Sequence, residues 1–166
     1  VELTLSGEYS TNDTITGGLT ATINLQNIDN IILTSGDDLV YTSELKNIHF
    51  DGGDGTDTLD YNNFVNGAGI TLYLSTSTIT KKNNDSQYDT FESIEAINGT
   101  QYNDTLVIDD IATGSSSDIA IDLAGGNNTL LFKTDTGLVY NVALGTVSDG
   151  TNSMNINSVT NIQIIG

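Results

Sequence analysis

The sequence predicts an all-β fold, and more specifically a parallel β-solenoid, on three observations. Proline is absent and the chain is rich in Thr, Ile, Val, Asn, Asp, Ser and Gly, the residues of short strands joined by turns. Apolar and polar residues alternate with period two in segments such as 19–25, 70–74 and 119–123. A polar turn followed by an apolar strand recurs along the chain.

The recurring turn places a carboxylate or amide two residues before a leucine or isoleucine. Its five copies are anchored at Asp13, Asp37, Asp57, Asp104 and Asn128. Successive anchors are 24, 20, 47 and 24 residues apart, so the long interval matches about two short ones. A unit of this size cannot bury its own apolar face and must stack on its neighbours. A β-sandwich is the alternative, because short strands joined by turns also suit it.

Length and charge describe one acidic domain. The 166 residues fit a single domain, 1–166, and the formal net charge of −18 implies self-repulsion that bound divalent cations would relieve. The only cationic side chains are Lys46, Lys81, Lys82 and Lys133, which argues against a nucleic-acid partner. Cysteine is absent, and no apolar run is long enough to span a bilayer. Because the chain opens with Val1 in strand-like sequence, we interpret it as a fragment of a larger protein.

The sharpest motif is the glycine-rich segment 52–60. Gly52-Gly53-Asp54-Gly55-Thr56-Asp57-Thr58-Leu59-Asp60 fits the nine-residue pattern Gly-Gly-x-Gly-x-Asp-x-apolar-x throughout. Glycine permits a tight turn that exposes carbonyl oxygens, and aspartate supplies the hard anionic oxygen that Ca²⁺ prefers. The segment resembles the RTX, or haemolysin-type, calcium-binding repeat. A plain hairpin turn is the alternative interpretation, and a phosphate site is disfavoured by the two aspartates.

The resemblance implies a parallel β-roll in which Ca²⁺, the expected cofactor, binds between the turns of successive coils. One motif cannot complete such a site, so Ser35-Gly36-Asp37-Asp38, one unit earlier, is expected to face Asp54 and Asp57. The predicted metal-binding residues are Gly36, Asp37, Asp38, Gly52, Asp54, Gly55, Asp57 and Asp104. The turns at 103–104 and 125–128 lack glycines or charge, so asparagine ladders are an alternative to the ion there.

Stacking of the turns at Asp37 and Asp57 predicts which side chains form the core. Leu39, Tyr41, Leu59 and Tyr61 are expected to lie beneath these turns in adjacent rungs, about 4.8 Å apart. Phe132 is likewise expected to face inward. The polar segment from Ser75 to Tyr88 is predicted to be an excursion from one coil.

Catalysis is not expected. His49 is the only histidine, and alternation places it opposite Ile48 and Phe50 on the solvent side of a strand. With one histidine and no cysteine, zinc sites and histidine-based triads lack their parts. Paired carboxylates can hydrolyse glycosides, but calcium binding explains them more simply.

The RTX resemblance implies a structural calcium-binding module of a secreted bacterial cell-surface protein, either an S-layer lattice or an adhesin. Such proteins leave the cell by type I secretion and fold on meeting extracellular Ca²⁺. Expected partners are calcium ions, neighbouring copies in a lattice, or surface glycans. Two alternatives stay open: an accessory calcium domain of a secreted enzyme, and the ligand-binding domain of an adhesin.

Overall fold

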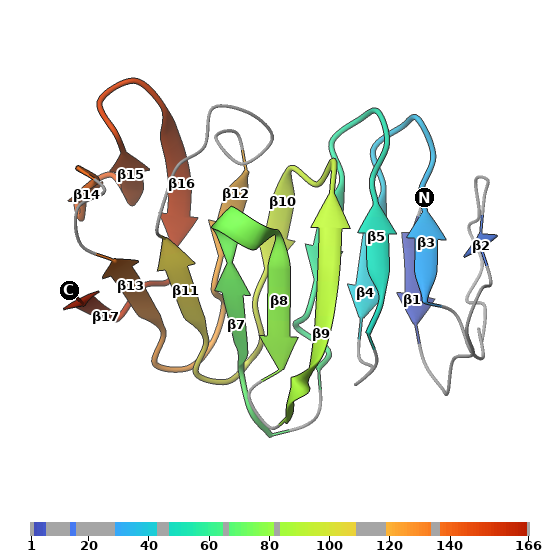
Figure 1. Cartoon of the computed structure of the whole chain (residues 1–166), viewed down its shortest axis with the longest axis horizontal. Helices are drawn as coiled ribbons and strands as arrows, with labels where there is room; N and C mark the ends of the chain where they lie inside the picture. The colour runs from blue at the N-terminus through green and yellow to red at the C-terminus, as the bar shows by residue number, and fades with distance from the viewer. Residues whose placement is uncertain are drawn as a thin grey trace.

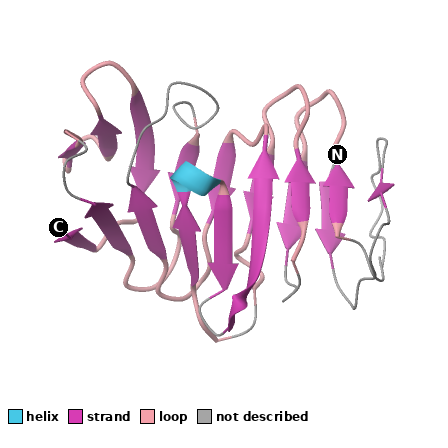
Figure 2. Ribbon diagram, viewed as in Figure 1, coloured by secondary structure: helices cyan, strands magenta, loops and turns pink. Residues whose placement is uncertain are grey.

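The computed structural model describes residues 2–5, 14–15, 29–42, 47–64, 67–81, 84–108, 119–133 and 137–165. Within these ranges the protein is built from strands, with a single turn of 3-10 helix, η1 (Leu74–Thr76), visible in cyan in Figure 2. The prediction of an all-β fold is confirmed.

The strands form two mixed sheets that face each other (Figure 1). Sheet A contains, in spatial order, β1 (Glu2–Leu5), β4 (Leu39–Thr42), β6 (Thr58–Asp60), β10 (Ala96–Asn98), β12 (Ala120–Asp122), β16 (Ser153–Asn157), β15 (Thr146–Ser148) and β14 (Val139–Asn141). Sheet B contains β17 (Asn161–Ile165), β13 (Thr129–Lys133), β11 (Thr105–Ile108), β7 (Ile70–Tyr73), β8 (Thr78–Lys81), β9 (Asn84–Glu92), β5 (His49–Asp51), β3 (Asn30–Ile32) and β2 (Thr14–Ile15).

The chain switches sheets at almost every turn. It passes from β3 to β4, then to β5 and to β6, and each strand pairs in parallel with the strand of the previous coil. Turns from sheet B to sheet A, at residues 33–38, 52–57 and 93–95, form the upper edge in Figure 1. Turns from sheet A to sheet B form the lower edge, and their described residues are 61–64 with 67–69, 99–104, 123–128 and 158–160.

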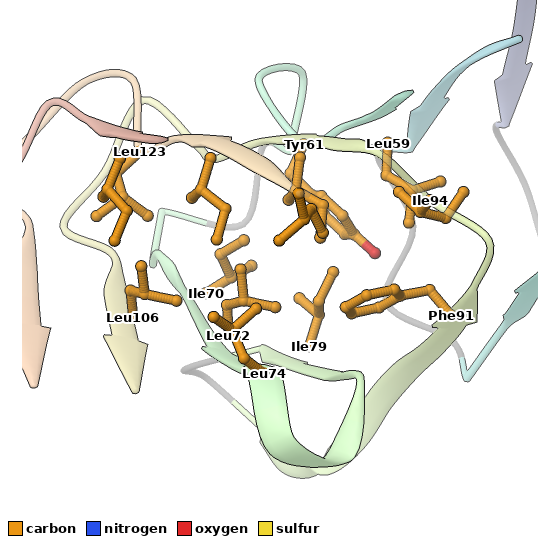
Figure 3. Close-up of a cluster of buried hydrophobic side chains, with 14 of the residues drawn as sticks. Leu59, Tyr61, Ile70, Leu72, Leu74, Ile79, Phe91, Ile94, Leu106 and Leu123 are labelled. Carbon is orange, nitrogen blue, oxygen red and sulfur yellow. The ribbon is translucent and has the colours of Figure 1, made fainter. Parts of the chain in front are cut away.

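Parallel register aligns the buried side chains into ladders. In sheet A, Val40 pairs with Leu59, Leu59 with Ile97, and Ile97 with Ile121, and all four are almost completely buried. In sheet B, Ile31, Phe50 and Phe91 form a similar row. The two sets of ladders meet in one apolar cluster (Figure 3), where burying each large side chain contributes roughly 1.5–3 kcal/mol.

The predicted ladder is wrong by one residue in β4. Leu39 pairs with Thr58, and both Leu39 and Tyr41 are only half-buried, whereas Val40 is the core residue. Leu59, Tyr61 and Phe132 are buried as predicted. Because strand side chains alternate, a slip of one residue moves every side chain to the other face. In the turn that precedes β4, Asp38 rather than Asp37 is therefore the residue that corresponds to Asp57 of the next turn.

The segment from Ser75 to Tyr88, predicted to be a polar excursion, contributes instead to sheet B: Thr78–Lys81 forms β8, and residues 84–88 belong to β9. β7, β8 and β9 form an antiparallel meander, in which β7 pairs with β11 and β9 pairs with β5. The 47 residues from Asp57 to Asp104 are therefore not two regular coils, as the spacing suggests. The interval is long because it contains the meander. The meander belongs to the core because Ile79 and Lys81 on β8 are fully buried.

Candidate functional site

The glycine-rich turns of the upper edge are stacked on one another. Gly55 has φ +128°, and a Cβ there would lie 2.8 Å from the carbonyl carbon of Gly36. A Cβ on Gly52 would lie 1.8 Å from the Ser93 carbonyl oxygen in the next turn. Only glycine fits positions where one backbone approaches another this closely. The turns at 33–38, 52–57 and 93–95 therefore form one continuous edge, as predicted for the first two.

Carboxylates bind this edge together from coil to coil. The backbone N–H of Asp38 donates to Asp57 Oδ1 at 2.8 Å, and the N–H of Asp57 donates to Glu95 Oε2 at 2.8 Å. Asp38 Oδ2 itself accepts from the N–H and hydroxyl of Thr34, at 2.7 and 2.8 Å. Each carboxylate thus holds a backbone amide of the preceding coil or of its own turn. Hydrogen bonds to an ionised carboxylate are stronger than neutral ones.

Asp57 is the unbalanced member of this ladder. It is fully buried, its Oδ2 has no hydrogen-bond partner among the described residues, and this atom lies beside the Cα of Gly52. Burial raises the pKa of Asp57 from 3.8 to about 6; the N–H of Asp38 opposes this rise, while the negative charges of Asp38, Glu95 and Asp37 reinforce it. A proton or a cation at this carboxylate would remove the strain between like charges.

Two further aspartates lie outside this ladder at the turn surface. Asp37 is exposed and its Oδ1 accepts a hydrogen bond from the N–H of Thr56 at 2.8 Å. Asp54 is exposed at the tip of the following turn. The upper edge therefore brings together Gly36, Asp37, Asp38, Gly52, Asp54, Gly55 and Asp57 on two neighbouring turns.

Asp104, the eighth predicted ligand, lies on the opposite edge. It follows β10 and precedes β11, so it belongs to a turn from sheet A to sheet B. Its Oδ1 accepts from the N–H of Ile70 and the hydroxyl of Thr100, at 2.7 and 2.9 Å, and its Oδ2 accepts from the N–H of Thr100 at 2.7 Å. Both oxygens are thus engaged by neutral donors.

Asn128 continues the lower-edge ladder without a charge. Its Oδ1 accepts from the N–H of Asp104 at 2.8 Å, and its Nδ2 donates to the carbonyls of Leu123, Gly125 and Ser158 at 2.9–3.0 Å. Asn128 thus joins the two turns through its side-chain amide, as the alternative of an asparagine in place of the ion requires. The described anchors therefore fall on two edges: Asp37 and Asp57 on the upper one, Asp104 and Asn128 on the lower one. The first anchor, Asp13, lies outside the described residues.

The acidic side chains of the upper edge do not converge on one point. Among the side chains that the structure describes, no group of three His, Cys, Asp or Glu residues is arranged to hold a metal ion. Asp57 is flanked by Asp38 and Glu95, but both neighbours direct carboxylate oxygens at backbone or hydroxyl donors. Chemically, the upper edge offers one free buried carboxylate oxygen and exposed carboxylates and carbonyls on adjacent turns.

His49 lies on β5 as the alternation predicted, between buried Ile48 and Phe50. Its Nδ1 is 2.9 Å from the hydroxyl of Thr90 and its Nε2 is 3.4 Å from Glu92 Oε1. Both partners are on β9, which pairs with β5 in parallel. The ring thus tethers two neighbouring strands at the surface.

A buried polar cluster escaped the sequence reasoning altogether. Lys81 on β8 and Asp89 on β9 form an ion pair of 2.9 Å with both side chains fully buried, and the hydroxyl of Tyr61 donates to Asp89 Oδ2 at 2.7 Å. The signal that was available is the alternation Thr78-Ile79-Thr80-Lys81, which places Lys81 on the same face of the strand as Ile79.

No protein-family model and no curated protein matches this chain. The similarity to the RTX repeat therefore rests on residues 52–60 themselves. Over the described ranges, no helix is long and apolar enough to cross a membrane.

Proposed function

We propose that this chain is a structural module of a secreted bacterial surface protein, a parallel β-solenoid that binds Ca²⁺ along its upper edge. The observation that carries the proposal is the stacking of the 33–38 and 52–57 turns, which places Asp57 against Asp38 with one buried oxygen unpartnered. Stacked coils that are joined by backbone pairing and carboxylate hydrogen bonds form a rigid, extended array. Such an array suits a structural role better than catalysis.

The donor set on the upper edge fits a calcium ion. Ca²⁺ takes six to eight oxygen ligands from carboxylates, backbone carbonyls and water. Asp57 Oδ2, with the exposed carboxylates of Asp37 and Asp54 and the carbonyls of the glycine turns, would supply such oxygens. When bound, the ion would supply positive charge to a stack of like charges that otherwise opposes coil stacking. The other ligands of the ion would be backbone carbonyl and water oxygens.

The lower edge supports a different role. Both oxygens of Asp104 already accept hydrogen bonds, and its successor is the neutral Asn128. A ladder that is satisfied by backbone amides has no need of an ion. We therefore place the proposed calcium at Asp37, Asp54 and Asp57, and assign Asp104 to holding the coils together.

A non-enzymatic role accords with the polar groups of the chain. His49 is tied to Thr90 and Glu92 on the neighbouring strand. Lys81, Asp89 and Tyr61 are sealed from solvent, where no substrate reaches them. The proposed setting is extracellular, after type I secretion, with neighbouring copies in a lattice or surface glycans as partners.

Thermal unfolding of the full chain, followed by circular dichroism, tests the proposal. Millimolar Ca²⁺ is expected to raise the Tm above that in chelator, and more than Mg²⁺ does, because Mg²⁺ demands tighter octahedral geometry. Asp54→Asn should reduce the calcium response. Asp149→Asn is the matched control, since Asp149 is also exposed and also precedes a glycine. Equal Tm values with calcium and with chelator would refute the calcium role.

A further inference from the structure

The buried cluster around Asp89 brings a primary amine against a carboxyl group. Lys81 Nζ is 2.9 Å from Asp89 Oδ1, on adjacent antiparallel strands β8 and β9. Asp89 Oδ1 also accepts from the N–H of Ile48 at 3.0 Å, and Asp89 Oδ2 accepts from the hydroxyl of Tyr61 at 2.7 Å. The side chains of Lys81, Asp89 and Tyr61 are all completely buried.

Burial makes the charged forms of this pair costly. Removing an ammonium and a carboxylate from water carries a desolvation penalty that their attraction repays only in part. Burial likewise raises the pKa of Asp89, against the charge and hydrogen bond of Lys81. Transfer of one proton from Lys81 to Asp89 converts the pair into a neutral amine beside a neutral carboxylic acid. These are the two reactants of amide formation.

We propose that Lys81 and Asp89 form an intramolecular amide bond, an isopeptide cross-link between β8 and β9. The Lys81 Nζ lone pair attacks Asp89 Cγ, forming the C–N bond and a tetrahedral intermediate. The Cγ–Oδ1 bond then breaks. Two of the three ammonium protons leave with Oδ1 as water, the third remains on the amide nitrogen, and Oδ2 becomes the amide oxygen. Atoms and charge balance without any further reactant.

The surrounding groups are placed to favour this step. The hydroxyl of Tyr61 points at Oδ2, where negative charge develops in the intermediate, and such a preorganised donor stabilises an oxyanion. The amine is held against one carboxyl group, and fixed geometry of this kind corresponds to effective concentrations of about 10⁵–10⁸ M. Tyr61, Ile79 and Phe91 belong to the apolar cluster seen in Figure 3, which excludes the water that would hydrolyse the intermediate.

The cross-link would clamp the meander into sheet B. β9 pairs with β5 of the preceding coil, and β7, at the other end of the meander, pairs with β11 of the following coil. β8 joins these two strands by antiparallel pairing with both. An amide across β8 and β9 retains the acceptor for Tyr61 while removing two buried charges. It thus converts an expensive ion pair into a neutral covalent contact.

Mass spectrometry of the full-length chain tests the bond directly. The intact mass, measured in denaturant, is expected to be lower than the sequence mass by one water molecule. Trypsin should cut after Lys46, Lys82 and Lys133 but not after amidated Lys81. The expected product is a branched species joining peptide 47–82 to peptide 83–133.

Two variants separate the cross-link from other losses of water. Lys81→Met should restore the full sequence mass, whereas a succinimide at an aspartyl-glycine pair, which also forms with loss of water, would persist in that variant and hydrolyse in mild alkali. Asp89→Asn should lose ammonia in place of water, because the amide nitrogen then leaves. Tyr61→Phe should slow bond formation after refolding by about 10²-fold.

A full sequence mass in wild-type protein with native circular dichroism, after prolonged incubation at neutral pH, would overturn the proposal. So would a water loss that Lys81→Met retains. An unchanged rate in Tyr61→Phe would overturn the role of the Tyr61 hydroxyl. The mass readout on wild-type protein does not depend on any variant folding.

Discussion

Replacing Asp57 with asparagine should stabilise the protein at neutral pH in the presence of chelator. Asparagine keeps an oxygen to accept the N–H of Asp38, and it removes a buried charge that lies among Asp38, Glu95 and Asp37. A carboxyl pKa raised from 3.8 to about 6 corresponds to roughly 3 kcal/mol at 1.36 kcal/mol per pKa unit. Screening by solvent and salt reduces this figure, so we expect a gain of about 1–3 kcal/mol.

The sign of the pH dependence follows from the raised pKa. A carboxyl group that binds its proton more tightly in the folded state stabilises that state fully below its unfolded pKa, here 3.8. This contribution is lost as the pH rises through about 6. As the pH falls from 7 to 4, the wild type should therefore gain stability relative to Asp57→Asn. The stability advantage of the variant should vanish near pH 4.

Asp104→Asn is the matched control on the lower edge. Both Asp104 oxygens accept hydrogen bonds, so an amide nitrogen in place of one of them would face an N–H or hydroxyl donor. Leaving a buried donor unsatisfied costs about 1–3 kcal/mol. The two Asp→Asn changes are thus expected to act in opposite directions at pH 7, although both remove one negative charge.

Urea unfolding at pH 7, 5.5 and 4, followed by circular dichroism, measures both effects. Two results together would contradict the assignment of a strained buried charge to Asp57. The first is that Asp57→Asn and Asp104→Asn destabilise the protein by similar amounts at pH 7. The second is that the difference in stability between Asp57→Asn and wild type does not change with pH. With saturating Ca²⁺ the order of wild type and Asp57→Asn should reverse, because Asp57→Asn lacks the carboxylate that would bind the ion.

Three further predictions test the packing. Gly52→Ala should lower the free energy of unfolding in urea by more than about 3 kcal/mol, because its Cβ would overlap the Ser93 carbonyl. The control Gly67→Ala, at φ +70° with open space around it, should lower it by about 1–2 kcal/mol. Val40→Ala should cost about 1–3 kcal/mol and Leu39→Ala clearly less, and the reverse order would disprove the observed register. Lys81→Met should cost about 3–5 kcal/mol by leaving Asp89 buried and unpaired, and adding Asp89→Asn should restore part of the Tm.

The sequence was sufficient for the features that local chemistry dictates. Period-two alternation predicted the strands β7 and β12, whereas the predicted segment 19–25 lies outside the described residues. The glycine motif predicted which turns stack. The register of β4 was not predictable in the same way, because Asp37 and Asp38 are consecutive and either can be aligned with Asp57. The choice is made by a hydrogen bond from Asp38 to Asp57, 19 residues away.

Long-range pairing accounts for what the sequence did not reveal. Nothing local to Thr90 indicates that it pairs with His49 across 41 residues, or that the chain returns through β8 before doing so. The burial of Lys81 also depends on Asp89 and Tyr61; Lys81 lies on β8, Asp89 on β9, and Tyr61 in the turn that follows β6. The burial of a charged residue in a mostly polar segment is therefore the feature that the sequence predicts least well.

The meander lengthens sheet B by two strands, β7 and β8, while β6 and β10 remain direct neighbours in sheet A. At about 4.8 Å per strand, sheet B extends roughly 10 Å further along the stacking direction than its partner. The C-terminal part of sheet A adds two antiparallel strands, β15 and β14, and Tyr140 on β14 meets Phe132 on β13 with ring centroids 6.5 Å apart. Two separate insertions thus offset one another, one on each face. A minimal tandem unit cut from this chain should lack both insertions or keep both, since each adds two strands to one sheet and removing only one leaves the two sheets unequal in length.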